Sequence, residues 1–430
     1  MLKVIPSRTI RLLLIAAALP LAISCGGNPS ETRQNQGSPM NQKTTGDNPA
    51  PGSKCPYRLD GRPDAEHGWT YLAETEGKKV YIPFEGYYES KGGRMQSPRF
   101  HLGKAPGKAG FFRLRFQAKA PVQGFWWVDL FDGNGKILPD INSALYASEK
   151  MIPYDEIIFT SSQAEYAQIA FVTKQGVVVQ NIVLEAVTPQ EAADWCDRVY
   201  AGITDKTYTP PSDGFARLPK TREALLTGKP WRIVMLGDSS VNDTWNSNFQ
   251  SLVMRDFPDA KLDFILSVRG STGCWYYREA ENFRQYVTDL KPDLVMIGGV
   301  SNAPDDPAKG DPEKNMLEVI RRCRELGCEV LVMSPPRSKE WRTSPDRKAV
   351  WSETAYDPRK VKLLRQDYQR AAVAATGTAY WDLTSWPCGI VGESCKPLGW
   401  FNRDPGGHNN DRGKQLLGQT LAGWFRTAKN

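Results

Sequence analysis

The second half of the chain alternates apolar strands with helices, and this rhythm limits the folds open to it. From Trp231 onward, stretches with helical periodicity, including one from Thr244 to Arg255, separate five short apolar runs. Such alternation predicts a parallel sheet covered on both faces, with right-handed crossovers. Ligands bind such sheets beyond the carboxyl ends of the strands. Functional residues are therefore expected just after the strands predicted at 232–236, 261–268, 294–300, 329–333 and 379–383.

The preceding region, residues 55–190, follows a two-residue period instead. Apolar and polar residues alternate from Phe112 to Lys119, which is typical of a half-buried strand. Several such strands with Gly/Pro turns predict an antiparallel β-sandwich, which in architecture resembles the jelly-roll modules of carbohydrate-active enzymes. Trp126 and Trp127 either pack in its core or bind a glycan. Asp132 and Asn134 fit a hairpin turn better than a calcium site.

The N-terminus predicts export. Arg8 and Arg11 precede an apolar run from Leu12 to Ile23, which is too short to span a bilayer, and small residues follow. This pattern indicates a signal peptide over residues 1–24. The segment around Cys25 resembles a bacterial lipobox, which implies a lipid anchor on that cysteine and an outer-membrane, periplasmic or cell-surface location. The alternative is an ordinary signal peptide with an incidental cysteine.

Residues 25–54 contain almost no large apolar side chains and predict a flexible tether. A predicted helix and a Pro-rich connector, residues 191–230, separate the sandwich from the α/β region at 231–430. The net charge of +7 comes from interspersed residues without a basic cluster, so nucleic acid is not an expected partner.

Eight cysteines accompany only three histidines. No Cys/His spacing suggests a metal site, and no cofactor is expected. Export would permit disulfides, for which Cys388–Cys395 and Cys55–Cys196 are the candidate pairs, although connectivity cannot be deduced from sequence.

A serine stands where the parallel sheet is expected to bind its ligand. The first predicted strand ends in Leu236-Gly237-Asp238-Ser239, and a helix follows. The N–H of Ser239 and the positive end of the helix dipole could face a developing oxyanion. The Gly-Asp-Ser triplet alone is equally a turn and helix-capping sequence.

A serine nucleophile needs a base, and the α/β region contains a single histidine, His408. It lies in a Gly/Pro loop before the last predicted helix, four residues after Asp404. Asp404 could hold the imidazole through its second nitrogen. The competing interpretation is a surface or helix-capping histidine.

The order of these residues resembles the SGNH/GDSL hydrolases over the last ~200 residues. The resemblance implies a flavodoxin-like, five-stranded parallel sheet and a catalytic triad of Ser239, Asp404 and His408. It also implies an oxyanion hole formed by the Ser239 amide, Gly273 and the side chain of Asn302.

Two departures from the family pattern concern spacing. Asp404 precedes His408 by four residues where the family has three, so another carboxylate such as Asp382 could orient the ring. Asn302 lies three residues after its glycine, where the family has two.

Aromatic residues flank the predicted site, among them Trp275 and Trp400, which could stack on sugar rings or simply pack. The expected activity is a serine ester hydrolase that removes O-acetyl or similar groups from a polysaccharide or oligosaccharide. The alternatives are an acyltransferase that uses a sugar as acceptor, and a non-catalytic glycan-binding surface lipoprotein.

Overall fold

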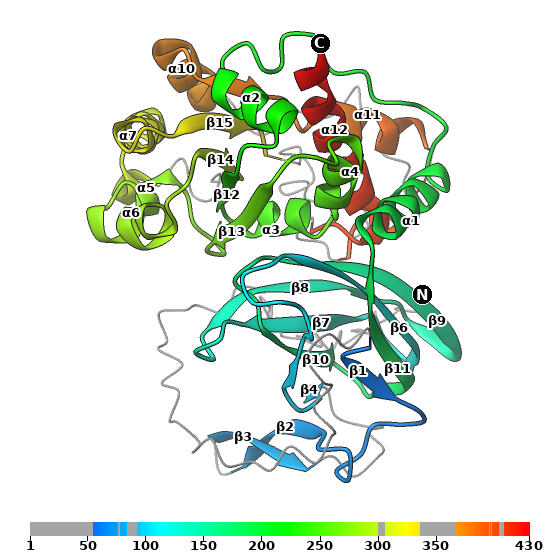
Figure 1. Ribbon diagram of the computed structural model, residues 1–430. Coiled ribbons are helices and arrows are strands. Elements are labelled where there is room, and N and C mark those ends of the chain that lie inside the picture. Colours follow the sequence, from blue (N-terminus) through cyan, green and yellow to red (C-terminus); the bar gives the residue numbers. More distant parts are fainter. Residues whose placement is uncertain are drawn as a thin grey trace, which may run out of the picture. The chain divides into compact units, whose positions relative to one another are not determined.

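The computed structural model of the chain describes residues 55–75, 78–83, 93–299, 306–335, 367–394, 396, 398–403 and 408–430 (Figure 1). The segments that carry Cys25, Asn302 and Asp404 lie outside this part. The antiparallel strands and the parallel sheet belong to one compact unit.

The β body consists of two antiparallel sheets, as predicted. One sheet has the strand order β1-β11-β6-β9, and the other has the order β3-β2-β4-β10-β7-β8, with β5 paired to β10. Inward-facing side chains such as Trp69, Phe112, Trp126 and Phe171 are buried between them. The strands are β1 (Tyr57–Leu59), β2 (Thr70–Thr75), β3 (Lys78–Pro83), β4 (Gly93–Gln96), β5 (Phe100–His101), β6 (Gly110–Ala120), β7 (Gly124–Phe131), β8 (Ile137–Leu145), β9 (Ser148–Thr160), β10 (Tyr166–Thr173) and β11 (Val178–Val187).

Strand β7 separates its two tryptophans by alternation, because successive side chains point to opposite faces of a sheet. Trp126 is 2% exposed and belongs to the core, whereas Trp127 lies on the opposite face and is partly exposed. The turn after β7 is closed by Asp132, whose carboxylate accepts hydrogen bonds from the backbone N–H groups of Asn134 and Lys136. Within the described residues, no group of His, Cys, Asp and Glu side chains is arranged to hold a metal ion.

The α/β body is a five-stranded parallel sheet with the order β13-β12-β14-β15-β16, the flavodoxin-like order predicted. Its strands are β12 (Trp231–Gly237), β13 (Leu262–Val268), β14 (Leu294–Gly298), β15 (Glu329–Met333) and β16 (Ala379–Trp381). The helices are α1 (Pro189–Ala201), α2 (Pro219–Thr227), α3 (Ser239–Trp245), α4 (Phe249–Asp256), α5 (Cys274–Tyr277), α6 (Ala280–Tyr286), α7 (Pro312–Glu325), α10 (Asp367–Thr376), α11 (Ser385–Glu393) and α12 (Asp411–Arg426), with short 3-10 turns at Thr288–Leu290, Pro307–Lys309, Leu398–Trp400 and Thr427–Lys429.

Both faces of this sheet are buried, which explains its continuous apolar strands. In β14, Leu294 and Met296 pack toward α1, α4 and α12, whereas Val295 and Ile297 pack toward α5, α6, α7 and α10. The first of these cores continues into the β body, because the ring of Phe159 in β9 lies 5.1 Å from the ring of Trp245 in α3.

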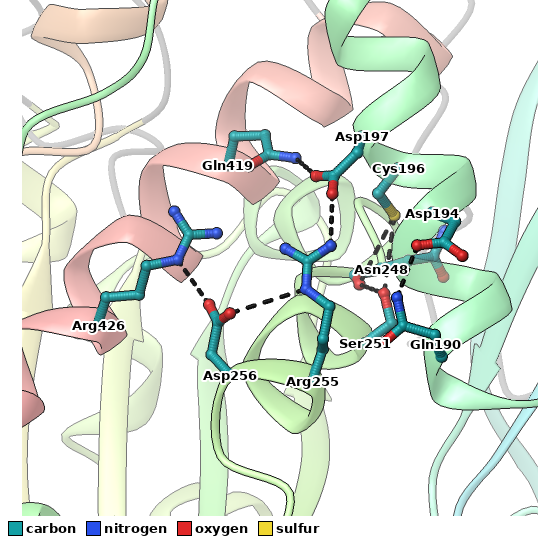
Figure 2. Close-up of polar contacts among 10 residues, drawn as sticks. All are labelled: Gln190, Asp194, Cys196, Asp197, Asn248, Ser251, Arg255, Asp256, Gln419 and Arg426. Atoms are coloured by element: carbon teal, nitrogen blue, oxygen red, sulfur yellow. Dashed lines mark hydrogen bonds and ion pairs between the residues drawn. The ribbon is translucent and has the colours of Figure 1, made fainter.

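A group of polar side chains ties α12 to α1 and α4; we call it the α12 clamp (Figure 2). Asp197 of α1 accepts a hydrogen bond from Gln419 of α12 at 2.7 Å and another from Arg255 of α4. Asp256 of α4 accepts a hydrogen bond from Arg426 of α12 at 2.6 Å. The clamp therefore fixes the helix that begins directly after the His408 loop.

The candidate disulfide between Cys55 and Cys196 does not form. Cys196 is a free thiol at the contact between α1 and α4, where it lies 3.7 Å from the Ser251 hydroxyl and donates to the carbonyl of Ser247. Cys55 instead precedes β1, and its thiol donates to the carbonyl of Tyr57. Cys395 lies outside the described residues, so its pairing with Cys388 stays a prediction.

Among the residues described, no helix combines the length and apolar character that crossing a membrane requires.

Candidate active site

Ser239 is the first residue of α3, at the carboxyl end of β12. The expected helix from Thr244 to Arg255 is two shorter helices instead, because Asn248 adopts a left-handed conformation (φ 58°) that interrupts the chain between them. The first of these begins five residues earlier than predicted, since Asp238 caps it by accepting a hydrogen bond from Ser240 N at 2.9 Å. The described residues offer no hydrogen-bond partner to the hydroxyl or the N–H of the half-buried Ser239.

Glycines let two strand ends approach each other beneath this serine. Gly237 and Gly298 are register partners on β12 and β14. A Cβ on Gly237 would lie 2.2 Å from the carbonyl oxygen of Gly298, and one on Gly299 would lie 2.1 Å from the Asp238 carboxylate. Gly299 also has a φ of 66°, which disfavours any side chain. The Ser239 turn is therefore packed directly against the end of β14.

The loop after β13 is fastened to the end of β12. The buried Tyr277 hydroxyl donates to the Gly237 carbonyl at 2.5 Å and accepts from Arg269 N at 3.1 Å. Burial raises the pKa of Tyr277, so its hydroxyl stays a hydrogen-bond donor. Gly273 follows as the extended residue that caps α5. Gly273 therefore lies on the same sheet edge as Ser239, its role as an oxyanion donor stays a prediction, and Asn302 lies outside the described residues.

His408 approaches from the other end of the chain. Asn402 and Asn409 form a bridge, and Arg403 N donates to the His408 carbonyl at 2.8 Å, so backbone bonds to Asn402 and Arg403 hold the chain at His408, just before α12. Asn410 caps α12 by accepting hydrogen bonds from Arg412 N and Gly413 N. The backbone that carries the imidazole is thus held by the bond from Arg403 N and by the capped start of α12.

Among the described residues, Asp243 of α3 is the carboxylate that contacts the His408 imidazole. Its Oδ2 atom lies 3.1 Å from Nδ1 of His408 and accepts a hydrogen bond from Asn409 N at 3.0 Å. Asp243 is four residues after Ser239, and residues at this spacing lie on the same helix face, with Cβ atoms ~5–6 Å apart. Ser239 thus lies one helical turn from Asp243 on α3, and Asp243 contacts His408, at the carboxyl end of β12.

Asp243 was not predicted from the sequence, because its position depends on where α3 begins. With the helix expected only at Thr244, Asp243 belonged to a loop of undefined direction. The signal was present in Asp238, a capping residue that allows the helix to start at Ser239. The alternative carboxylate Asp382 serves another purpose, since it accepts hydrogen bonds from the N–H groups of Thr384 and Ser385 at the start of α11. The role of Asp404 stays a prediction.

The surroundings of this pair are crowded with buried charges. Arg403 Nη2 lies 3.8 Å from Asp243 Oδ1, and their side chains are 8% and 1% exposed. Lys414, one turn into α12, is also buried; desolvation and then repulsion from Arg403 lower its pKa to about 8. Buried charges with perturbed pKa values are characteristic of functional sites.

The two predicted sugar-stacking residues are partly exposed, and each has a cation over its ring. Lys309 Nζ lies 4.1 Å from the ring centre of Trp275, and the Arg412 guanidinium lies 4.4 Å from that of Trp400. Other aromatics expected near the site belong to the core, among them Trp381 and Phe401, which are 3% and 1% exposed.

No protein-family profile matches the chain, and no curated protein matches its sequence. Among solved structures, the chain is similar to a two-domain esterase (CEX) active on acetylated mannans, with 14% identity and a TM-score of 0.39 over 50% of this chain and 54% of that one. The matched region spans about half the length of that esterase.

Two further solved structures are similar over nearly their whole length. One is described as a GDSL-like lipase from Parabacteroides merdae, with 13% identity and a TM-score of 0.35 over 47% of this chain and 96% of that one. The other is a catalytic mutant of Axe2, an acetylxylan esterase from Geobacillus stearothermophilus, with 12% identity and a TM-score of 0.35 over 46% and 95%.

Proposed function

We propose that the chain is a serine ester hydrolase with Ser239 as nucleophile and His408 as general base. The observation that carries this proposal is the imidazole–carboxylate pair of His408 and Asp243, one helical turn from a serine at a helix N-terminus. A nucleophile, a base and a group that orients the base are the parts that acyl transfer requires.

In the proposed reaction, Nε2 of His408 takes the proton of the Ser239 hydroxyl while Oγ attacks the ester carbonyl. The resulting oxyanion accepts hydrogen bonds from Ser239 N and Gly273 N, with Asn302 as the third predicted donor. Imidazolium then protonates the leaving alcohol, which departs and leaves an acyl-serine. Water, deprotonated by His408, attacks this ester, and the acid is released as the serine regains its proton.

We propose an acyl group on a carbohydrate, such as an O-acetyl group, as the substrate. Support comes from Trp275 and Trp400, two partly exposed aromatic side chains in the α/β body, because sugars stack on such rings. Transfer to a sugar instead of water is the competing outcome, and product analysis with and without an oligosaccharide acceptor separates the two.

The test of the nucleophile is hydrolysis of p-nitrophenyl acetate by the wild type and Ser239→Ala. We expect the substitution to lower kcat by about a thousandfold or more, since the remaining groups cannot replace the nucleophile. Ser212→Ala, at an exposed position of the connector, is the matched control and should keep full activity. Equal rates in the wild type and Ser239→Ala would remove the assignment.

We further propose that Cys25 carries a lipid anchor that holds the exported chain on a membrane. Acyl chains contribute about 0.8 kcal/mol per buried methylene, so a chain with several of them stays membrane-bound. Cys25→Ser should move the protein from the detergent phase to the aqueous phase and abolish globomycin-sensitive processing. Unchanged partitioning of the variant would contradict the anchor.

A further inference from the structure

The β body reaches the candidate active site through a carboxylate. Asp140 lies on β8, and its Oδ1 atom accepts a hydrogen bond from Asn242 Nδ2 at 3.2 Å. Asn242 is a buried residue of α3, directly before Asp243. A side chain of the antiparallel sheet therefore holds the helix turn that carries both Ser239 and the partner of His408.

Arg403 forms a second connection between the same two places. Its guanidinium lies 5.6 Å from the ring centre of Phe125 in β7, and its carbonyl accepts a hydrogen bond from Gln123. The same guanidinium lies beside the Asp243 carboxylate, and it attracts Asp140 electrostatically. Arg403 is thus a buried cation that lies beside the carboxylate touching His408 and acts electrostatically on a carboxylate of the β body.

We propose that Asp140 is a positioning residue of the esterase site, through which the β body sets the orientation and the charge of the His408–Asp243 pair. The inference rests on the proposed function and extends it: the β body becomes part of the catalytic apparatus in addition to any role in binding glycans. Asn242 transmits the position, and Arg403 transmits the charge.

The sign of the electrostatic effect follows from the order of charges. Asp243 stabilises the imidazolium that forms on His408 during acyl transfer, and Arg403 opposes it. Asp140 offsets part of the charge of Arg403. Without the Asp140 anion, the positive charge of Arg403 is less offset, so protonation of His408 is expected to become less favourable.

Other charges surround this chain of groups. Asp129 on β7 and Arg94 on β4 face Asp140, while Lys414 on α12 faces Arg403 and Asp243. Burial and the neighbouring Asp129 raise the pKa of Asp140 to about 6. Asp140 is therefore mostly ionised at pH 7.5, where the comparison between variants is made.

The test uses Asp140→Asn, which keeps an oxygen for Asn242 and removes only the charge. Glu185→Gln is the matched control. It removes a β-body carboxylate that pairs with Arg115, and both residues belong to the sheet that does not contain Asp140. The full chain contains only three histidines, so imidazole NMR signals can be assigned to His408 with His408→Gln. We expect Asp140→Asn to lower the pKa of His408 by about half a unit and Glu185→Gln to leave it unchanged.

The kinetic readout separates positioning from folding. For Asp140→Asn we expect kcat to fall by about tenfold, with KM changed less than about twofold, and the acid limb of the pH–rate profile to move to lower pH. An unchanged or raised pKa of His408, or a loss confined to KM, would overturn the inference. If Ser239→Ala is inactive while Asp140→Asn is fully active, the proposed function stands and this inference fails. If Ser239→Ala is active, the proposed function fails, while the NMR titration still tests the coupling.

Discussion

Two groups of polar side chains flank α12, and they are built in opposite ways. The α12 clamp near the end of the helix pairs each charge directly and keeps it partly exposed: Asp197 is 45% exposed and Arg426 37%. The group at the start of the helix, which we call the histidine cluster, consists of Asp140, Asn242, Asp243, Arg403 and His408. There the side chains of Asp243 and Arg403 are almost fully buried, and their charged atoms are 3.8 Å apart.

This difference separates anchoring from chemistry. Partly exposed, directly bonded ion pairs contribute modestly to stability and require little desolvation. Buried charges at longer separations are expensive to maintain, and such groups persist at sites where their electrostatic field is used. The comparison predicts that changes in the clamp alter stability alone, whereas changes in the histidine cluster alter activity and leave stability equal or higher.

The largest effect is expected from Asp243→Asn. Loss of the anion that touches Nδ1 removes both the orientation of His408 and the stabilisation of its imidazolium, so kcat should fall by about 10²- to 10⁴-fold. The measurement is esterase kinetics on p-nitrophenyl acetate, with Asp404→Asn assayed beside it. Wild-type activity in Asp243→Asn together with inactivity in Asp404→Asn would mean that Asp404 orients the His408 imidazole. The buried histidine cluster would then not be the part of the molecule that serves catalysis.

The second effect is a gain in stability. The pKa of Asp140 is raised from 3.8 to about 6, so the folded state binds this proton more tightly than the unfolded chain. Its ionised form therefore destabilises the fold as the pH rises from about 4 to 6, and the effect is constant above that range. Because the Asp140 side chain is partly exposed, solvent screening reduces the expected loss of stability to about 1–2 kcal/mol.

Asp140→Asn should accordingly unfold at a higher denaturant concentration than the wild type at pH 7.5, and the difference should vanish near pH 4. A variant that is less stable than the wild type at pH 7.5 would show that the carboxylate stabilises the fold. That result would contradict the prediction that changes in the histidine cluster do not lower stability.

The third effect belongs to the clamp. Arg255→Met removes the cation between Asp197 and Asp256, while Gln419 and Arg426 remain to bond those carboxylates. We expect the free energy of unfolding to fall by about 1 kcal/mol, with kcat and KM unchanged. Urea denaturation and esterase kinetics on the same samples check both halves of this prediction; a large loss of kcat would mean that the clamp, too, serves the site.

The smallest effect is expected at the rim of the clamp region. Gln190 and Asp194 form an exposed hydrogen bond of 2.7 Å along one turn of α1 (Figure 2). Gln190→Ala should change the free energy of unfolding by less than about 0.5 kcal/mol. A shift of the urea midpoint as large as that of Arg255→Met would show that the clamp extends beyond its ion pairs.

The periodicity of the chain predicted both sheets, because the order of apolar and polar residues in each strand indicates whether one or both of its faces are buried. Strand β6 alternates and buries one face, whereas β14 is apolar throughout and buries both. Ser239 and Gly273 could be placed on one sheet edge by the same reasoning, since parallel strands end together. Their chemical roles stay proposals.

The histidine cluster could not be predicted in the same way. Asp243 depends on the first residue of α3, which periodicity does not resolve within one turn. Asp140 bonds Asn242, and Arg403 packs on Phe125, across the contact between two bodies, and nothing in the local pattern of β8 or around His408 indicates that contact. Likewise, neither spacing nor compartment revealed that Cys196 points into the packing between α1 and α4.

Cys196 is one of three buried thiols whose chemical reactivity can report on local opening of the fold. Burial raises the pKa of Cys196 to about 12 and also raises the pKa values of Cys274 in α5 and Cys323 in α7. Alkylating reagents attack the thiolate, so each of these cysteines reacts only when its own helix detaches. The rates of labelling at the three positions therefore measure the local unfolding of three separate helices. No probe has to be introduced into the chain.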